Sequence, residues 1–104
     1  MIRNILSAAL ASGAVFASSA LAQGADPNLG RNLAAACANC HGTNGVSAQG
    51  MPNLAGLQRT YLVQQMQDFK TGKRPATIMH QLAKGYTDEQ IDALAAYFSA
   101  QKAR

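Results

Sequence analysis

The feature of this sequence that most restricts its fold is a pair of cysteines followed directly by a histidine. Cys37, Cys40 and His41 form the pattern C-x-x-C-H within a stretch of helical periodicity. Positions i, i+3 and i+4 lie on one side of a helix, so the two thiols and the imidazole face the same partner. This pattern is the attachment sequence of haem c. We therefore predict one covalent haem, with thioethers at Cys37 and Cys40 and with His41 as the proximal iron ligand.

Two other uses of a C-x-x-C pair compete with haem attachment. A thioredoxin-like redox pair is expected near a βαβ pattern, and the sequence has none. A zinc site needs four ligands, and beyond His41 only His80 remains as an ordinary nitrogen donor. The adjacent histidine and the helical context favour haem.

Residues 1–22 are predicted to form a cleaved signal peptide. A short basic start is followed by an apolar stretch over residues 5–17 and by the sequence Ala-Leu-Ala at 20–22. An A-x-A ending is typical of signal peptidase sites, and the apolar stretch is too short and too broken to span a bilayer. We expect residues 23–104 to form a single soluble domain in the periplasm, without a membrane span after cleavage.

The remaining sequence predicts an all-α fold. A first helix is expected to have Asp26 as its N-cap and Pro27 as its first helical position, and to run toward Cys40. Glycines, asparagines and a proline in residues 42–56 predict a loop. A second helix is expected over about residues 60–70, with an apolar face at helical spacing and a stop at Gly72.

Two further helical segments are expected near the C-terminus. Residues 76–84 are predicted to contain a helical turn. Thr87 and Gln90 form a capping box that starts the last helix. The apolar face of that helix consists of Ile91, Leu94, Ala95 and Phe98. Three to four short helices would thus pack around the haem, whose macrocycle adds the apolar surface that such a small domain lacks.

The second axial ligand decides the class of function, and the candidates are Met51, Met66, Met79 and His80. Met66 lies on the apolar stripe of the second helix, where packing explains it. Met51 is too close to His41 in sequence to reach the opposite haem face easily. Met79 is far enough along the chain to close that face, and a Met/His pair is typical of electron-carrying cytochromes. Met79 is favoured, and the other three stay as alternatives.

Three more residues are candidates for contacts around the haem. Pro52 offers a carbonyl that can accept the second ring N–H of His41, the contact that orients most ligating histidines. Arg59 and Tyr61 can reach a haem propionate. Each has a simpler explanation, as a loop proline or as a solvated residue at a helix start.

With these residues in place, the chain resembles class I cytochromes c. More narrowly, it is similar to cytochrome c4-type domains and to the cytochrome subunit of flavocytochrome c sulfide dehydrogenase. The resemblance rests on C-A-N-C-H-G at 37–42, M-P-N-L-A-G at 51–56, Y-L-V-Q-Q-M-Q-D-F-K-T-G-K-R at 61–74, T-I-M-H-Q-L-A-K-G-Y-T at 77–87 and A-A-Y-F at 95–98. It implies a haem crevice closed by Met79 and packing between the first and last helices. Many of these relatives carry two such domains, whereas this chain has one attachment motif.

The expected function is the transfer of single electrons, not catalysis by the chain alone. The resemblance implies a carrier or the electron-accepting subunit of a dehydrogenase, sulfide dehydrogenase among them. A flavin would belong to a separate flavoprotein partner, because the sequence lacks G-x-G-x-x-G. A net charge of +4 without a recognition motif favours a redox protein partner over nucleic acid. The competing class is a ligand-binding or catalytic haem protein with an open distal site.

Overall fold

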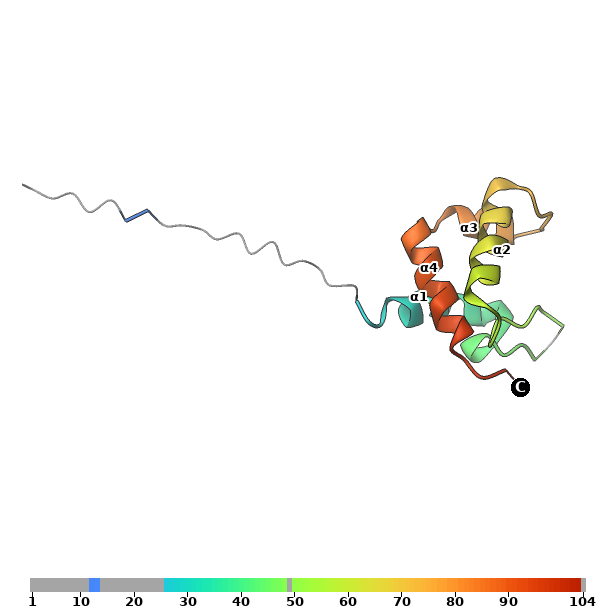
Figure 1. Cartoon of the computed structure of the whole chain (residues 1–104). Coiled ribbons are helices and arrows are strands. Elements are labelled where there is room, and N and C mark those ends of the chain that lie inside the picture. The colour runs from blue at the N-terminus through green and yellow to red at the C-terminus, as the bar shows by residue number, and fades with distance from the viewer. Residues whose placement is uncertain (1–11, 14–25, 49, 104) are drawn as a thin grey trace, which may run out of the picture.

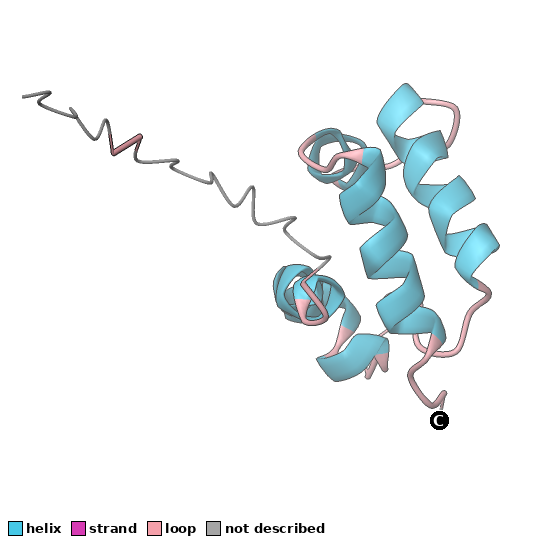
Figure 2. Cartoon of the chain, turned by 60° about the vertical axis from the view of Figure 1, so that its left-hand side comes forward, coloured by secondary structure: helices cyan, strands magenta, loops and turns pink. Residues whose placement is uncertain are grey.

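The computed structural model describes residues 12–13, 26–48 and 50–103, and all regular structure in these ranges is helical (Figures 1 and 2). The elements are α1 (Leu29–His41), the short 3-10 helix η1 (Thr43–Gly45), α2 (Arg59–Thr71), α3 (Met79–Lys84) and α4 (Asp88–Ser99). The all-α fold predicted from sequence is therefore confirmed. Apart from residues 12 and 13, the predicted signal peptide lies outside the described ranges. Within them, no helix is both long and apolar enough to cross a membrane.

The C-terminal helix α4 holds the fold together. It crosses α1 and packs along α2, while α3 lies against α2 (Figure 1). The capping box predicted at its start is present, since Thr87 Oγ1 accepts from the Gln90 N–H (3.1 Å) and the Gln90 side chain accepts from the Thr87 N–H (2.9 Å). The predicted apolar face of Ile91, Leu94, Ala95 and Phe98 is buried. Local capping and one apolar stripe thus fix where this helix starts and which side it buries.

The close crossing of α1 and α4 depends on a glycine. A Cβ atom on Gly30 would lie 2.5 Å from the carbonyl oxygen of Ala93 and 3.0 Å from the Cβ of Tyr97. These distances are shorter than van der Waals contact, and the first involves backbone that cannot rotate away. Gly30 therefore permits the two helices to approach as closely as they do.

The second helix agrees with the sequence prediction to within a residue at each end. α2 ends at Thr71 and is capped by Gly72, whose backbone is left-handed (φ 80°, ψ 4°) and whose N–H donates to the carbonyl of Phe69. Such a C-terminal glycine is the usual way to close a helix. Leu62 is buried in the core, and Met66 is half-buried on the same face.

The predicted start of the first helix was wrong by two residues. α1 begins at Leu29 after Asn28, whose backbone (φ −98°, ψ 2°) is not helical. Asp26 forms a tight turn instead, because its carboxylate accepts from the Asn28 N–H (2.9 Å) and its carbonyl accepts from the Leu29 N–H (3.0 Å). The Asp26 side chain, which was expected to cap the helix, therefore stabilises the turn that precedes the helix.

The segment predicted as loop contains the short helix η1. Asn44 within it has a left-handed backbone (φ 55°, ψ 22°). Asparagine tolerates this conformation better than most residues with a side chain. Asn44 lies among several glycines in a segment without helical periodicity, so the sequence predicted only a loop there.

Replacing Gly30 with alanine is predicted to destabilise the protein. The added methyl group must push α1 and α4 apart, and the loss of packing outweighs the gain in helix propensity. We expect a net decrease in unfolding free energy of about 1–2 kcal/mol, measured by chemical denaturation. Gly85→Ala is the matched control, because φ is −78° there and a Cβ would meet only the Leu82 carbonyl at 3.4 Å. Equal effects of the two substitutions would contradict this account of the crossing.

Candidate functional site

The site is built around His41, the last residue of α1. Its side chain is buried, with 7% of its surface exposed, and its Nδ1 lies 2.8 Å from the carbonyl oxygen of Pro52. A carbonyl can only accept, so Nδ1 carries the proton and donates it to this bond. The lone pair then resides on Nε2. This is the tautomer and ring orientation in which a neutral imidazole binds a metal.

The position of the Pro52 carbonyl is set by contacts on its C-terminal side. The carbonyl of Gly45 accepts from the N–H groups of Leu54 (2.9 Å) and Ala55 (3.2 Å), and the Gly56 N–H donates to the carbonyl of Phe98 on α4 (2.9 Å). These bonds fold the segment after η1 back onto the end of α1. The proline predicted from sequence to contact His41 therefore does so.

The two cysteines lie one helical turn apart on α1, and no disulfide joins them. Cys37 is half-buried and packs against the core, whereas Cys40 is exposed. Burial raises the pKa of the Cys37 thiol; a backbone hydrogen bond lowers it and the nearby Cys40 raises it further, both by smaller amounts. The helix thus presents two sulfur atoms and one imidazole, the set that the attachment sequence predicts.

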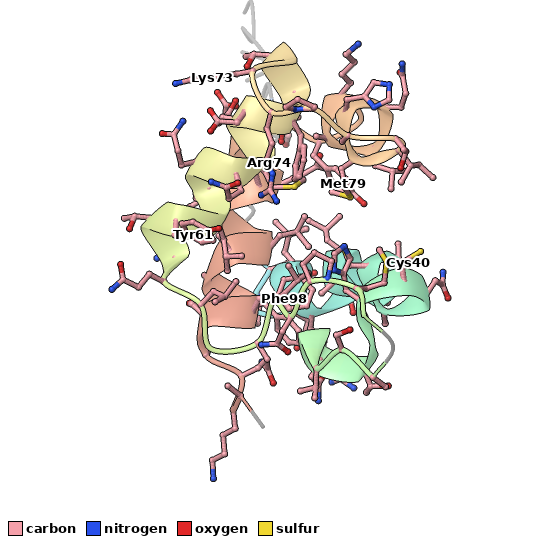
Figure 3. The ribbon with its side chains drawn as sticks, turned by 90° about the vertical axis from the view of Figure 1, so that its right-hand side faces the viewer. Cys40, Tyr61, Lys73, Arg74, Met79 and Phe98 are labelled. Carbon is pink, nitrogen blue, oxygen red and sulfur yellow. The ribbon has the colours of Figure 1, made fainter. Side chains whose placement is uncertain are left out.

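Met79 is the first residue of α3 and is half-buried. Figure 3 shows Met79 on α3 above and Cys40 on α1 below, on the same side of the molecule. The other three candidates for the second axial ligand differ in their exposure. Met51 is 41% exposed, Met66 is half-buried on α2, and the Nδ1 of His80 is buried with no hydrogen-bond partner among the described residues.

Arg59 and Tyr61 lie at the start of α2. Nε of Arg59 donates to Oδ1 of Asp92 on α4 (2.9 Å), and Nη2 of Arg59 pairs with Oδ2 of the same carboxylate. Tyr61 is 49% exposed. Contacts of these two side chains with a haem propionate remain predictions.

Tyr86, between α3 and α4, was missed as a site residue. The pKa of its hydroxyl is raised by burial and, to a smaller extent, by the charge of Cys37. Tyr86 and Cys37 both pack against the same buried core. The Tyr86 carbonyl also accepts from Nζ of Lys70 (2.6 Å). An aromatic residue directly after Gly85 and before the capping box was the signal available in the sequence.

These residues fit a covalently bound haem. The donor set is two thiols on one helix, a histidine nitrogen with a free lone pair and a methionine thioether, which are typical groups for haem attachment and iron ligation. Apolar surface is available as well, since several apolar side chains around the core are only partly buried. They include Leu33, Leu54, Leu57 and Val63.

Comparison with known proteins identifies the family. A sequence profile described as "Cytochrome c" matches residues 28–102, most of the chain. The chain belongs to the cytochrome c family. Membership implies covalent haem c and electron transfer, and Cys37, Cys40 and His41 occupy the matching attachment motif.

Curated relatives of this cytochrome c domain support the narrower resemblance. The cytochrome subunit of sulfide dehydrogenase from Chlorobaculum tepidum is 44% identical over 69 residues, which cover 66% of this chain and 63% of that protein. Cytochrome c-554(548) from Halomonas halodenitrificans is 37% identical over 84 residues, which cover 74% of this chain and 98% of that protein. The chain therefore spans less than two thirds of the first relative and nearly all of the second.

A solved structure supports the same assignment. Cytochrome c4 from Acidithiobacillus ferrooxidans matches with a TM-score of 0.63 and 33% identity, over 73% of this chain and 51% of that one. Together with the family match, it confirms the cytochrome c fold and the resemblance to cytochrome c4.

Replacing Tyr86 with phenylalanine is predicted to change the response of stability to alkaline pH. Because burial raises the pKa of this hydroxyl above its ordinary value of 10.0, the folded state holds the proton more tightly than the unfolded state. The contribution of this hydroxyl to the free energy of unfolding is complete below pH 10 and is lost as the pH rises above that value. Burial remains as the cause once Cys37 is a thioether and carries no charge.

The measurement is urea unfolding from pH 8 to pH 11, with the wild-type protein as the reference. We expect Tyr86→Phe to reduce the loss of stability above about pH 10. An identical alkaline loss in wild type and Tyr86→Phe would show that Tyr86 does not contribute.

Proposed function

We propose that this chain is an exported cytochrome with a single haem that transfers electrons one at a time. Cys37 and Cys40 would carry the thioether bonds, and His41 and Met79 would be the axial ligands. The observation that carries the proposal is the hydrogen bond from His41 Nδ1 to the Pro52 carbonyl at 2.8 Å. It fixes the tautomer in which Nε2 can bind iron.

Each of these residues has a separate task. When bound, the haem supplies an iron that alternates between the ferrous and ferric states. Cys37 and Cys40 fix its orientation against α1. The bond to the Pro52 carbonyl would make Nε2 of His41 a stronger donor and favour the ferric state, whereas the thioether of Met79 would favour the ferrous state. Side chains in both axial positions would also exclude small ligands and limit the rearrangement that accompanies each transfer.

The predicted signal peptide supports a cellular location for this protein, and the names of its relatives support a class of redox partner. The sequence of residues 1–22 supports export to the periplasm. One relative is named as the cytochrome subunit of sulfide dehydrogenase, and another as the electron acceptor of thiosulfate dehydrogenase. We propose a redox protein partner, such as a flavoprotein dehydrogenase subunit, from which this chain accepts electrons. The other form of the same function that we propose is an independent electron carrier.

Carbon monoxide binding tests the assignment of Met79. The reduced wild-type protein is predicted not to bind carbon monoxide, because Met79 occupies the sixth position. Met79→Ala should bind it readily and should lose the sulfur-to-iron charge-transfer band of the oxidised protein. Both effects are read from absorption spectra.

Met51→Ala is the matched control, since it removes an exposed methionine that the proposal gives no role. It should behave as wild type. Carbon monoxide binding to wild type would mean an open distal site, and therefore a ligand-binding or catalytic haem protein. An unchanged spectrum in Met79→Ala would exclude this methionine and direct the search to Met66 and His80.

A further inference from the structure

The loop that orients His41 is held at both ends by two consecutive residues of α4. At one end, the Tyr97 hydroxyl donates to Oδ1 of Asn44 (2.6 Å). At the other end, the Gly56 N–H donates to the carbonyl of Phe98 (2.9 Å). The Pro52 carbonyl lies in the segment between these two points. The end of α4 is therefore connected to the group that bonds His41.

The two ends of the loop are also joined to each other. The Gly45 carbonyl accepts from the N–H groups of Leu54 and Ala55 at 2.9 and 3.2 Å. Gly45 is buried directly against Phe98, because a Cβ atom on it would lie 2.7 Å from Cδ1 of that ring. A shift of η1 would thus move the Gly45 carbonyl and, with it, the residues that follow Pro52.

Asn44 is the point in this loop that most needs to be held. Its left-handed backbone (φ 55°, ψ 22°) is disfavoured for residues with a side chain, although asparagine tolerates it better than most. The only side-chain hydrogen bond to Asn44 within the described ranges comes from Tyr97. The Tyr97 hydroxyl therefore stabilises the conformation in which η1 follows directly from His41 and Gly42.

We propose that Tyr97 is a positioning residue that sets the strength of the hydrogen bond between His41 and Pro52, and through it the reduction potential of the haem. This inference rests on the proposed function and adds a residue that lies outside the haem attachment sequence and is not one of the proposed axial ligands. A strong bond from Nδ1 makes His41 a better donor to ferric iron and lowers the potential. Weakening that bond should raise it.

The hydroxyl of Tyr97 can be removed without removing its packing. The ring contacts Phe98 edge-to-face, with centroids 5.4 Å apart and planes at 74°. Tyr97→Phe keeps this ring and deletes only the donor to Asn44. Ser99→Ala is the matched control, since it deletes another α4 hydroxyl whose hydrogen bond, to the Ala96 carbonyl at 3.0 Å, stays within the helix.

The experiment uses the exported, haem-loaded proteins after removal of the predicted signal peptide. Reduction potentials are measured by spectroelectrochemistry, and exchange of the His41 Nδ1 proton with solvent is measured by NMR on the reduced form. Tyr97→Phe should raise the potential and speed proton exchange about threefold to tenfold, the range expected for the loss of one ordinary hydrogen bond. Ser99→Ala should leave both quantities at their wild-type values.

A second substitution tests the route from Tyr97 to His41. Asn44→Gly removes the acceptor while allowing the left-handed backbone, so it should shift the potential in the same direction as Tyr97→Phe. The double variant should show no further shift, because both substitutions delete the same bond. Asn44→Asp keeps an acceptor oxygen and should retain most of the wild-type potential.

Two results would overturn the inference. One is a lowered melting temperature in Tyr97→Phe with an unchanged potential and unchanged proton exchange, which would make Tyr97 purely structural. The other is an additive shift in the double variant. Failure of the proposed function can be distinguished from failure of this inference. It would appear in the wild type, as carbon monoxide binding or as absence of covalent haem.

Discussion

The hydrogen bond from His41 to the Pro52 carbonyl is the interaction on which the site depends. In the neutral ring it leaves the lone pair on Nε2, and it fixes the plane of the imidazole. To form it, the chain must reverse directly after α1, and Gly42 (φ 86°, ψ 163°) makes the reversal possible. A Cβ atom at this position would lie 2.0 Å from the carbonyl oxygen of Val46. The geometry of the ligand is therefore built into the backbone of the loop.

The rest of the fold supports this loop from α4. This helix packs against α1 and α2, and its last turn provides the contacts to Asn44 and Gly56. The protein core is small, and among the described residues Ile91 is the largest with no exposed surface (0%). A covalent haem would add a large apolar surface to such a core. Attachment and folding are thus expected to reinforce each other, with the same cofactor serving stability and electron transfer.

Local signals in the sequence predicted much of this structure. The cysteine and histidine spacing, the capping box at Thr87 and the apolar stripe of α4 are short-range patterns with direct physical meaning. The start of α1 was wrong because Asp26 bonds within a turn instead of capping the helix. The pair of Arg59 with Asp92 and the bond of Tyr97 to Asn44 join residues 33 and 53 positions apart. Such contacts depend on how the helices pack, and no local sequence pattern predicts them.

The most direct test of the account is the absorption spectrum of the purified protein, oxidised and reduced, with and without carbon monoxide. A covalent haem with His41 and Met79 as ligands predicts a low-spin spectrum, a sulfur-to-iron charge-transfer band in the oxidised form and no response to carbon monoxide. A high-spin spectrum that shifts with carbon monoxide, or the absence of covalent haem, would contradict it.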